Sequence, residues 1–282
     1  MAELINISMS LNENSMQLVF GHAFTDHSVQ KLITSMRLGF DYYKYPQVEV
    51  VMDSLGGDAR AMKALLEEVQ LISKQKKQLT IVAGNQCASA AAIVLANGTW
   101  GTRRTKRDTL LLFHSPLAHL RAEQTLNRES GEVLVKVLSN IGANLLSQLV
   151  QNQCQQVGGA DALLSHMRNR LDEVTQHWNA MSDKLFEVVN KKSDKPTATL
   201  QRLGSNLDRW SKLKNEEMKV KKLIELLNQR FDMDTLMDLR EAYALCLIDK
   251  VDGLLPVSAP VAQARACMAL CSDITSIPSP KG

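Results

Sequence analysis

Residues 79–92 read Leu-Thr-Ile-Val-Ala-Gly-Asn-Gln-Cys-Ala-Ser-Ala-Ala-Ala, and this stretch decides the fold. The apolar run 79–83 predicts a buried strand, and a short turn is expected after it. The alanine-rich end predicts a helix that begins at or near Ser89. A serine is thereby expected where a strand passes into a helix.

The segments on both sides repeat this alternation of strand and helix. Strands are expected at 15–21, 47–53, 79–84 and 109–114, and helices at 26–41, 58–74 and 89–97. Strict alternation implies parallel strands joined by right-handed crossover helices, so the predicted class is α/β.

Three of the expected strands end at residues that suit acyl-transfer chemistry. The strand at 47–53 leads to Gly56 and Gly57, the strand at 79–84 leads to Ser89, and the strand at 109–114 ends at His114. A serine hydroxyl is a weak nucleophile until a neighbouring base takes its proton, and His114 is the candidate base. Gly56 or Gly57, together with the N–H of Ala90, are the candidate oxyanion donors. Taken singly, Ser89 is more simply explained as a helix N-cap and His114 as a buried structural histidine.

The same segments resemble the signature segments of the ClpP family, the proteolytic subunits of Clp proteases. They are 53–57 (Asp-Ser-Leu-Gly-Gly), 87–90 (Cys-Ala-Ser-Ala) and 113–117 (Phe-His-Ser-Pro-Leu), in the family's order and with its interval between Ser89 and His114. The resemblance runs from about residue 20 to 120 and resumes at 239–251. Leu55 and Cys246 depart from it, since the family usually has proline and glycine there.

The resemblance implies a spiral of ββα units, a fold that the crotonase group shares, and a serine endopeptidase acting through Ser89 and His114. It also implies that the loop at Gly56 and Gly57 binds the backbone of a polypeptide substrate in extended form. Counting back from 241–249 without gaps puts Arg230 where the family has its aspartate. A small shift would restore the triad, so Asp232 is preferred as the acid and Asp234 is held in reserve. A Ser-His dyad or an inactive site stays open.

The chain after His114 predicts helices beyond a compact core. A helix is expected at 123–155, where the family has the handle that joins two rings. After Gly158 and Gly159, a heptad seam over 164–188 and a second amphipathic helix over 203–227 predict an antiparallel coiled-coil hairpin that projects as an arm. The expected divisions are a core at 1–157, the hairpin at 158–229, a return to the core at 230–256, and a short helix with a flexible tail at 257–282.

Composition restricts the classes of protein. The 282 residues are 45% hydrophobic and 22% charged, with a net charge of +3, and a nucleic-acid partner is not expected from so small a charge. The five cysteines form no CxxC pair, so reduced thiols in the cytoplasm are expected, and neither a metal nor a cofactor. No window is expected to reach membrane-spanning length.

Three interpretations compete. The leading one is a ClpP-like serine endopeptidase in a homo-oligomeric ring that hides its active sites. Because the sequence has no Walker A motif, a separate AAA+ unfoldase or another protein that docks on the arm would then control access. The second is a non-catalytic ClpP-like scaffold or adaptor that acts through its helices. The third is an acyl-CoA enzyme of the crotonase group, against which the alanine-rich 88–92 argues because that group uses a glycine-rich segment.

Overall fold

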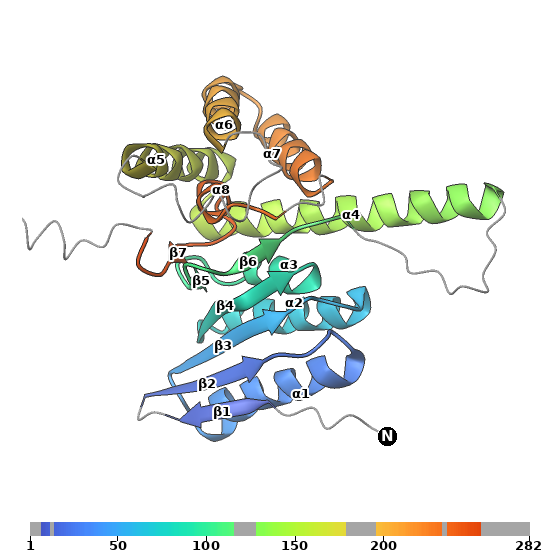
Figure 1. Cartoon of the computed structure of the whole chain (residues 1–282), viewed down its shortest axis with the longest axis vertical. Helices are drawn as coiled ribbons and strands as arrows, with labels where there is room; N and C mark the ends of the chain where they lie inside the picture. The colour runs from blue at the N-terminus through green and yellow to red at the C-terminus, as the bar shows by residue number, and fades with distance from the viewer. Residues whose placement is uncertain (1–6, 12–13, 116–127, 179–195, 233–235, 255–282) are drawn as a thin grey trace, which may run out of the picture.

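The computed structural model describes residues 7–11, 14–115, 128–178, 196–232 and 236–254, and it contains one sheet covered by helices (Figure 1). The strands are β1 (Ser8–Leu11), β2 (Ser15–Phe20), β3 (Gln47–Ser54), β4 (Gln78–Ala88), β5 (Arg103–Thr105), β6 (Leu110–Leu112) and β7 (Lys250–Val251). The helices are α1 (Asp26–Arg37), η1 (Leu38–Tyr42, a π-helical turn), α2 (Ala59–Lys74), α3 (Ala90–Ala96), α4 (Arg128–Val157), α5 (Ala160–Trp178), α6 (Pro196–Trp210), α7 (Glu216–Phe231) and α8 (Leu239–Ala244).

The sheet has the strand order β1-β2-β3-β4-β5-β7, with β6 paired to β4. β1 runs antiparallel to β2, and the other pairs are parallel, as the alternation of strands and helices predicts. The strands β2 and β3 bury every second side chain, which is the pattern of a sheet with one covered face. The helices α1, α2 and α3 lie side by side along the sheet (Figure 1).

The strand β4 is longer than the sequence predicts. A turn is expected after residue 84, yet the strand continues to Ala88 and changes its partner on the way. Residues Ile81–Ala83 pair with β5, and residues Gln86–Ala88 pair with β6. Gly84 lies at the change of partner, where an added Cβ would come within 2.6 Å of the Asp53 side chain. The hydrogen-bonded part of β4 therefore extends to Ala88, the residue directly before Ser89.

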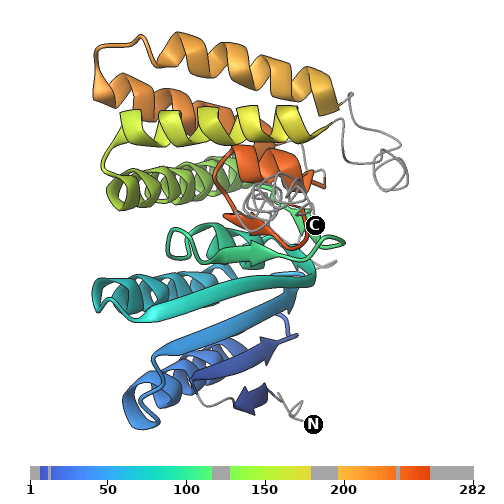
Figure 2. The same ribbon diagram turned by 90° about the vertical axis from the view of Figure 1, so that its left-hand side faces the viewer.

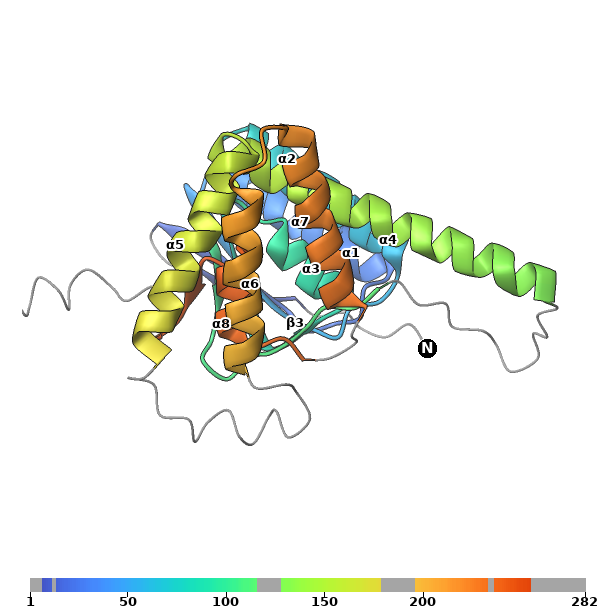
Figure 3. The same cartoon turned by 90° about the horizontal axis from the view of Figure 1, so that it is seen from above.

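The helices α5, α6 and α7, called here the helical cap, pack against the core and do not project from it. They lie over α4 and α8 in Figure 2 and side by side in Figure 3. The expectation of a projecting arm is therefore wrong for the described residues. Residues 179–188 of the predicted heptad seam lie outside them.

The physical reason is that the apolar faces of the cap helices are wide enough to contact more than one another. Their buried side chains join the same hydrophobic cluster as those of α4 and α8. The second predicted helix also ends early, since residues 211–215 separate α6 from α7 and the Asn215 side chain caps the new helix. The cap members of the cluster are Leu163, Leu164, Met167, Leu171, Val174, Leu200, Leu203, Leu207, Trp210, Leu223, Leu227 and Phe231.

The helix α4 has two different halves. Leu146, Leu149 and Val150 are buried in the core, whereas Val133 and Val135 are 58% and 64% exposed on the half that extends beyond the other helices (Figure 3). By length and composition alone, α4 could cross a membrane: an 18-residue window within Glu132–Val157 has a mean hydropathy of 1.4, and 17% of that window is buried. This corrects the expectation that no window reaches that length. The apolar run is hard to recognise in the sequence because Ser, Asn and Gln residues interrupt it, although these residues carry no charge.

A buried ion network joins the cap to the sheet. Arg103, which is fully buried, donates through Nε to Oδ2 of Asp249 at 2.7 Å, and Arg170 of α5 donates to Oδ1 of the same carboxylate at 2.8 Å. The indole of Trp100 lies 4.8 and 4.7 Å from the two guanidinium carbons. Burial alone raises the pKa of Asp249, but the hydrogen bonds and charges of the two arginines outweigh it and lower that pKa.

We predict that Asp249→Asn lowers the free energy of unfolding by about 3 kcal/mol, because it leaves Arg103 buried without its anion. Since folding lowers the pKa of Asp249, its stabilisation is complete above the ordinary carboxyl pKa of about 3.9 and is lost as the pH falls below it. Denaturant unfolding at a series of pH values measures both effects. The matched control is Asp252→Asn, whose partly exposed pair with Arg104 predicts a loss within about 1 kcal/mol. Equal losses for the two variants would contradict the assignment.

Candidate active site

Ser89 occupies a backbone conformation that few side chains adopt. Its φ is 56° and its ψ is −125°, between the end of β4 and the first turn of α3. Its N–H donates to the carbonyl of Leu112 at 2.9 Å, and its own carbonyl accepts from Ile93 at 3.1 Å. Its side chain makes no capping hydrogen bond, which contradicts the simpler explanation of Ser89 as a helix N-cap. The hydroxyl is therefore left for the pocket that it lines.

The Gly56–Gly57 turn packs directly against this serine. At Gly56, which has a φ of +92°, an added Cβ would lie 2.7 Å from the Ser89 Cβ and 2.8 Å from the amide nitrogen of Ala90. At Gly57, with a φ of +147°, an added Cβ would meet the backbone of Phe24. Only glycine allows this approach of two backbones. The paired glycines are thus required by geometry at the site.

Hydrogen bonds in the turn distinguish Gly56 from Gly57 as candidate oxyanion donors. The N–H of Gly56 already donates to Ser54 Oγ at 3.1 Å. In the part of the chain that the structure describes, no hydrogen bond occupies the N–H of Gly57 or of Ala90. Both residues line the pocket together with Ser89. Gly57 and Ala90 are therefore the donors that the geometry favours.

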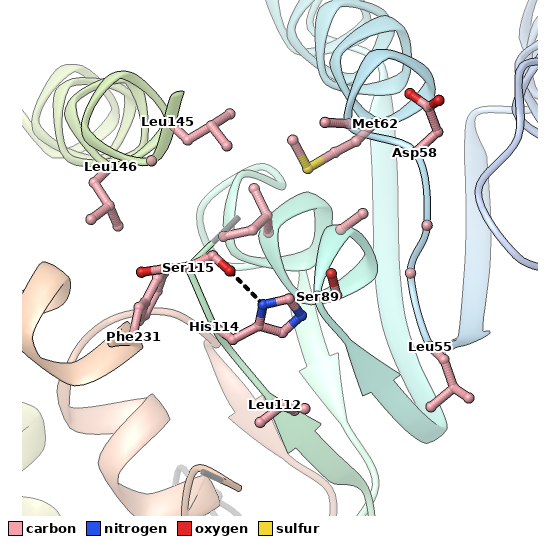
Figure 4. Close-up of a pocket in the computed structure, with 16 residues that line it drawn as sticks. Leu55, Asp58, Met62, Ser89, Leu112, His114, Ser115, Leu145, Leu146 and Phe231 are labelled. Carbon is pink, nitrogen blue, oxygen red and sulfur yellow. Dashed lines mark hydrogen bonds between the residues drawn. The ribbon is translucent and has the colours of Figure 1, made fainter. Parts of the chain in front are cut away.

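His114 follows β6 and lies in the same pocket. Its Nδ1 is 2.6 Å from the backbone carbonyl oxygen of Ser115, and Figure 4 shows the second ring nitrogen on the side of Ser89. A carbonyl only accepts, so Nδ1 carries the proton in this contact, and in the neutral imidazole Nε2 is then the nitrogen with the lone pair. That is the tautomer that a general base requires. No hydrogen bond between Ser89 and His114 is formed in these described segments, and such bonds commonly tighten only around a substrate.

The structure does not place Asp232 on His114. The Asp232 carboxylate accepts from the hydroxyl of Ser115 and, at 3.1 Å, from the side-chain amide of Asn228. Arg230, the residue reached by the gap-free count, forms an ion pair with Glu241, with Nη2 and Oε2 3.0 Å apart. Asp234 lies outside the described residues. Asp232 therefore contacts Ser115, and Ser115 in turn contacts His114.

The pocket has a volume of about 900 Å³ and mostly apolar walls. Its lining residues are Leu55, Gly56, Gly57, Asp58, Ala59, Met62, Ser89, Ala90, Ile93, Leu112, His114, Ser115, Gly142, Leu145, Leu146 and Phe231. The walls from α4 and α7 were not predicted from the sequence. Nothing in the spacing of Leu145, Leu146 or Phe231 distinguishes a pocket wall from an ordinary core face.

Cys87, the cysteine nearest to Ser89 in the sequence, is not a competing nucleophile. Cys87, two residues before Ser89, is fully buried, and burial raises the pKa of its thiol, so the nucleophilic thiolate is suppressed. Among the residues that the structure describes, no group of three or more His, Cys, Asp or Glu side chains is arranged to hold a metal ion.

Comparison with known proteins agrees with the motif resemblance. The sequence model of the Clp protease family matches residues 3–158, more than half of the chain. Proteolytic subunit 1 of the ATP-dependent Clp protease of Bifidobacterium longum (strain NCC 2705) is 29% identical over 143 residues, which cover 43% of this chain. The chain spans 59% of the length of that relative. The mixed α/β structure is consistent with the ClpP fold, and the chain belongs to the Clp protease family.

Proposed function

We propose that this protein is a ClpP-like serine endopeptidase with Ser89 as nucleophile and His114 as general base. The observation that carries the proposal is the conformation of Ser89, whose hydroxyl is not used for capping and lines one pocket with His114 and two unoccupied backbone donors. Non-glycine residues at positive φ concentrate at functional sites, where the surrounding structure holds the strain. The family membership supports the same chemistry.

The proposed reaction begins with an extended peptide beside the Gly56–Gly57 turn. The Ser89 oxygen attacks the scissile carbonyl while Nε2 of His114 takes its proton, and the N–H groups of Gly57 and Ala90 stabilise the resulting oxyanion. The histidine then gives that proton to the leaving amine, and the C–N bond breaks. A water molecule, deprotonated by the same nitrogen, hydrolyses the acyl-enzyme and returns Ser89 to its resting form.

Asp232 is proposed to act through Ser115. Its carboxylate binds the Ser115 hydroxyl, and the carbonyl of Ser115 faces Nδ1 of His114. The acid would thereby fix the position of the carbonyl that orients the imidazole. In this arrangement Asp232 is a positioning residue, and Ser89 and His114 form the catalytic dyad.

We also propose a homo-oligomeric ring that takes polypeptide substrates with the help of a separate ATPase. ClpP-family proteins typically form rings, and the relative from B. longum is named as a subunit of an ATP-dependent protease. The exposed valines on the extended half of α4 give this chain an apolar surface for a second copy. The cytoplasm is the proposed location, because five cysteines without a CxxC pair are typical of a protein that keeps its thiols reduced.

Labelling with a fluorophosphonate probe tests the proposed nucleophile. We expect the wild-type chain to be labelled at Ser89, as located by mass spectrometry, and Ser89→Ala to lose the label. His114→Ala should slow labelling about 10²–10⁴-fold, because the base no longer takes the serine proton. Ser10→Ala, on the exposed strand β1, is the control. A folded wild-type sample that is not labelled would contradict the peptidase and favour the non-catalytic scaffold.

A double-mutant cycle tests the role of Asp232. If the acid acts through Ser115, Ser115→Ala and Asp232→Asn should each lower kcat/KM about tenfold, a typical effect of losing one charge-assisted hydrogen bond. The double variant should lose no more than the larger single loss, and both single variants should shift the acidic limb of the pH profile alike.

A direct contact between Asp232 and His114 predicts a different result. Asp232→Asn would then lower kcat about 10⁴-fold, as in triads that lose their acid, and Ser115→Ala would be nearly neutral. Asp208→Asn, an exposed aspartate of α6, is the control for loss of a surface carboxylate.

Sedimentation velocity tests the ring. We expect the wild type to sediment as a multiple of the 31.3 kDa chain, and Val135→Asp with Val137→Asp to shift it toward smaller species. Because both valines are exposed in the single chain, the fold should keep its stability within about 0.5 kcal/mol per substitution. Met218→Asp, exposed on the cap, is the control. A wild-type monomer at micromolar concentration would contradict the assembly.

A further inference from the structure

One wall of the active-site pocket comes from the helical cap. Phe231 is the last residue of α7, is 2% exposed, and lines the pocket that contains Ser89 and His114. Its ring stacks on Phe113 with the centroids 4.7 Å apart and the planes at 19°. Phe113 directly precedes the catalytic histidine. The phenyl ring of Phe231 is therefore held in place by the same strand end that carries the base.

The neighbours of Phe231 make this wall apolar. Figure 4 shows Phe231 with Leu145 and Leu146 of α4 on the side of the pocket away from Leu55. The one carboxylate among the lining residues is Asp58, which accepts from the N–H of Arg60 at 2.6 Å as the N-cap of α2. The carboxylate of Asp58 is thus engaged in capping α2. Among the polar lining residues, Ser115 has its hydroxyl bonded to Asp232. The apolar residues of this wall suit an uncharged, apolar side chain.

Stacking on Phe113 distinguishes Phe231 from the other wall residues. Leu145 and Leu146 lie in the middle of α4, and Met62 has a flexible side chain that fills space adaptively. Phe231 is a flat ring with few rotatable bonds, fixed by stacking on Phe113. A larger substrate side chain would have to displace that ring and break the stacking. The stacked ring is therefore a fixed part of the pocket wall.

We propose that Phe231 determines specificity by limiting the size of the apolar side chain on the residue whose carbonyl Ser89 attacks. This inference rests on the proposed function, because it takes Ser89 as the nucleophile. The helical cap would then be part of the active site, since α7 supplies a wall of the substrate pocket. Substrates with side chains of the size of leucine would be preferred to those with tryptophan.

Labelling rates with peptidyl diphenyl phosphonates test the inference on the full chain. Two probes differ only in the side chain next to phosphorus, which is that of leucine or of tryptophan, and each forms a covalent bond to the serine oxygen with loss of phenol. We expect Phe231→Ala to raise the tryptophan-to-leucine ratio of second-order rate constants at least about tenfold, since pocket contacts of this size change selectivity by that order. Phe231→Trp should lower the ratio.

Leu227→Ala is the matched control, because Leu227 is fully buried one turn earlier on α7 and does not line the pocket. It should slow both probes alike. Phe231→Leu, which keeps a buried apolar side chain, replaces Phe231→Ala if that variant does not fold, with a smaller rise expected. A ratio that moves no more than in Leu227→Ala would overturn the inference, while labelling of Ser89 would leave the proposed function standing. Absence of any label on wild-type Ser89 would remove both.

Discussion

The pairing of Arg103 with Asp249 is the constraint on which the rest of the structure depends. Arg103 is fully buried, and besides Asp249 it donates to the carbonyls of Ala96 and Cys246, at the ends of α3 and α8. A buried guanidinium is tolerated only when anions and carbonyls satisfy it, so these elements must meet at one point. Arg170 of α5 donates a further hydrogen bond to the carboxylate of Asp249. The helical cap is thereby joined to the segment that closes the sheet.

The conformation of Ser89 in the pocket also depends on contacts from several elements. Ser89 keeps its unusual conformation because the carbonyl of Leu112 binds its N–H on one side and Gly56 packs on the other. Three strand ends, from β3, β4 and β6, must therefore stay in register for the serine to face the histidine. The strain at one residue is offset by contacts distributed over the sheet.

Two departures from the family pattern have different consequences. Cys246 has a φ of +57° just after α8, a conformation that glycine adopts without cost, which explains why the family usually has glycine there. Its carbonyl is bound by Arg103 and Gln153, and these bonds hold the residue in place. Leu55 is 67% exposed at the rim of the pocket, where no close packing demands proline.

The sequence by itself determined the alternation of strands and helices, the meeting of Ser89, His114 and the paired glycines in one pocket, and the family. Local periodicity and the positions of strand ends carry that information, because parallel strands bring their carboxyl ends to one edge. Only the tertiary structure decided where the inserted helices lie and which residue Asp232 binds. It also decided that Phe231 lines the pocket. An amphipathic seam specifies that a face is buried but not its partner, and a carboxylate reaches different neighbours after small shifts of backbone.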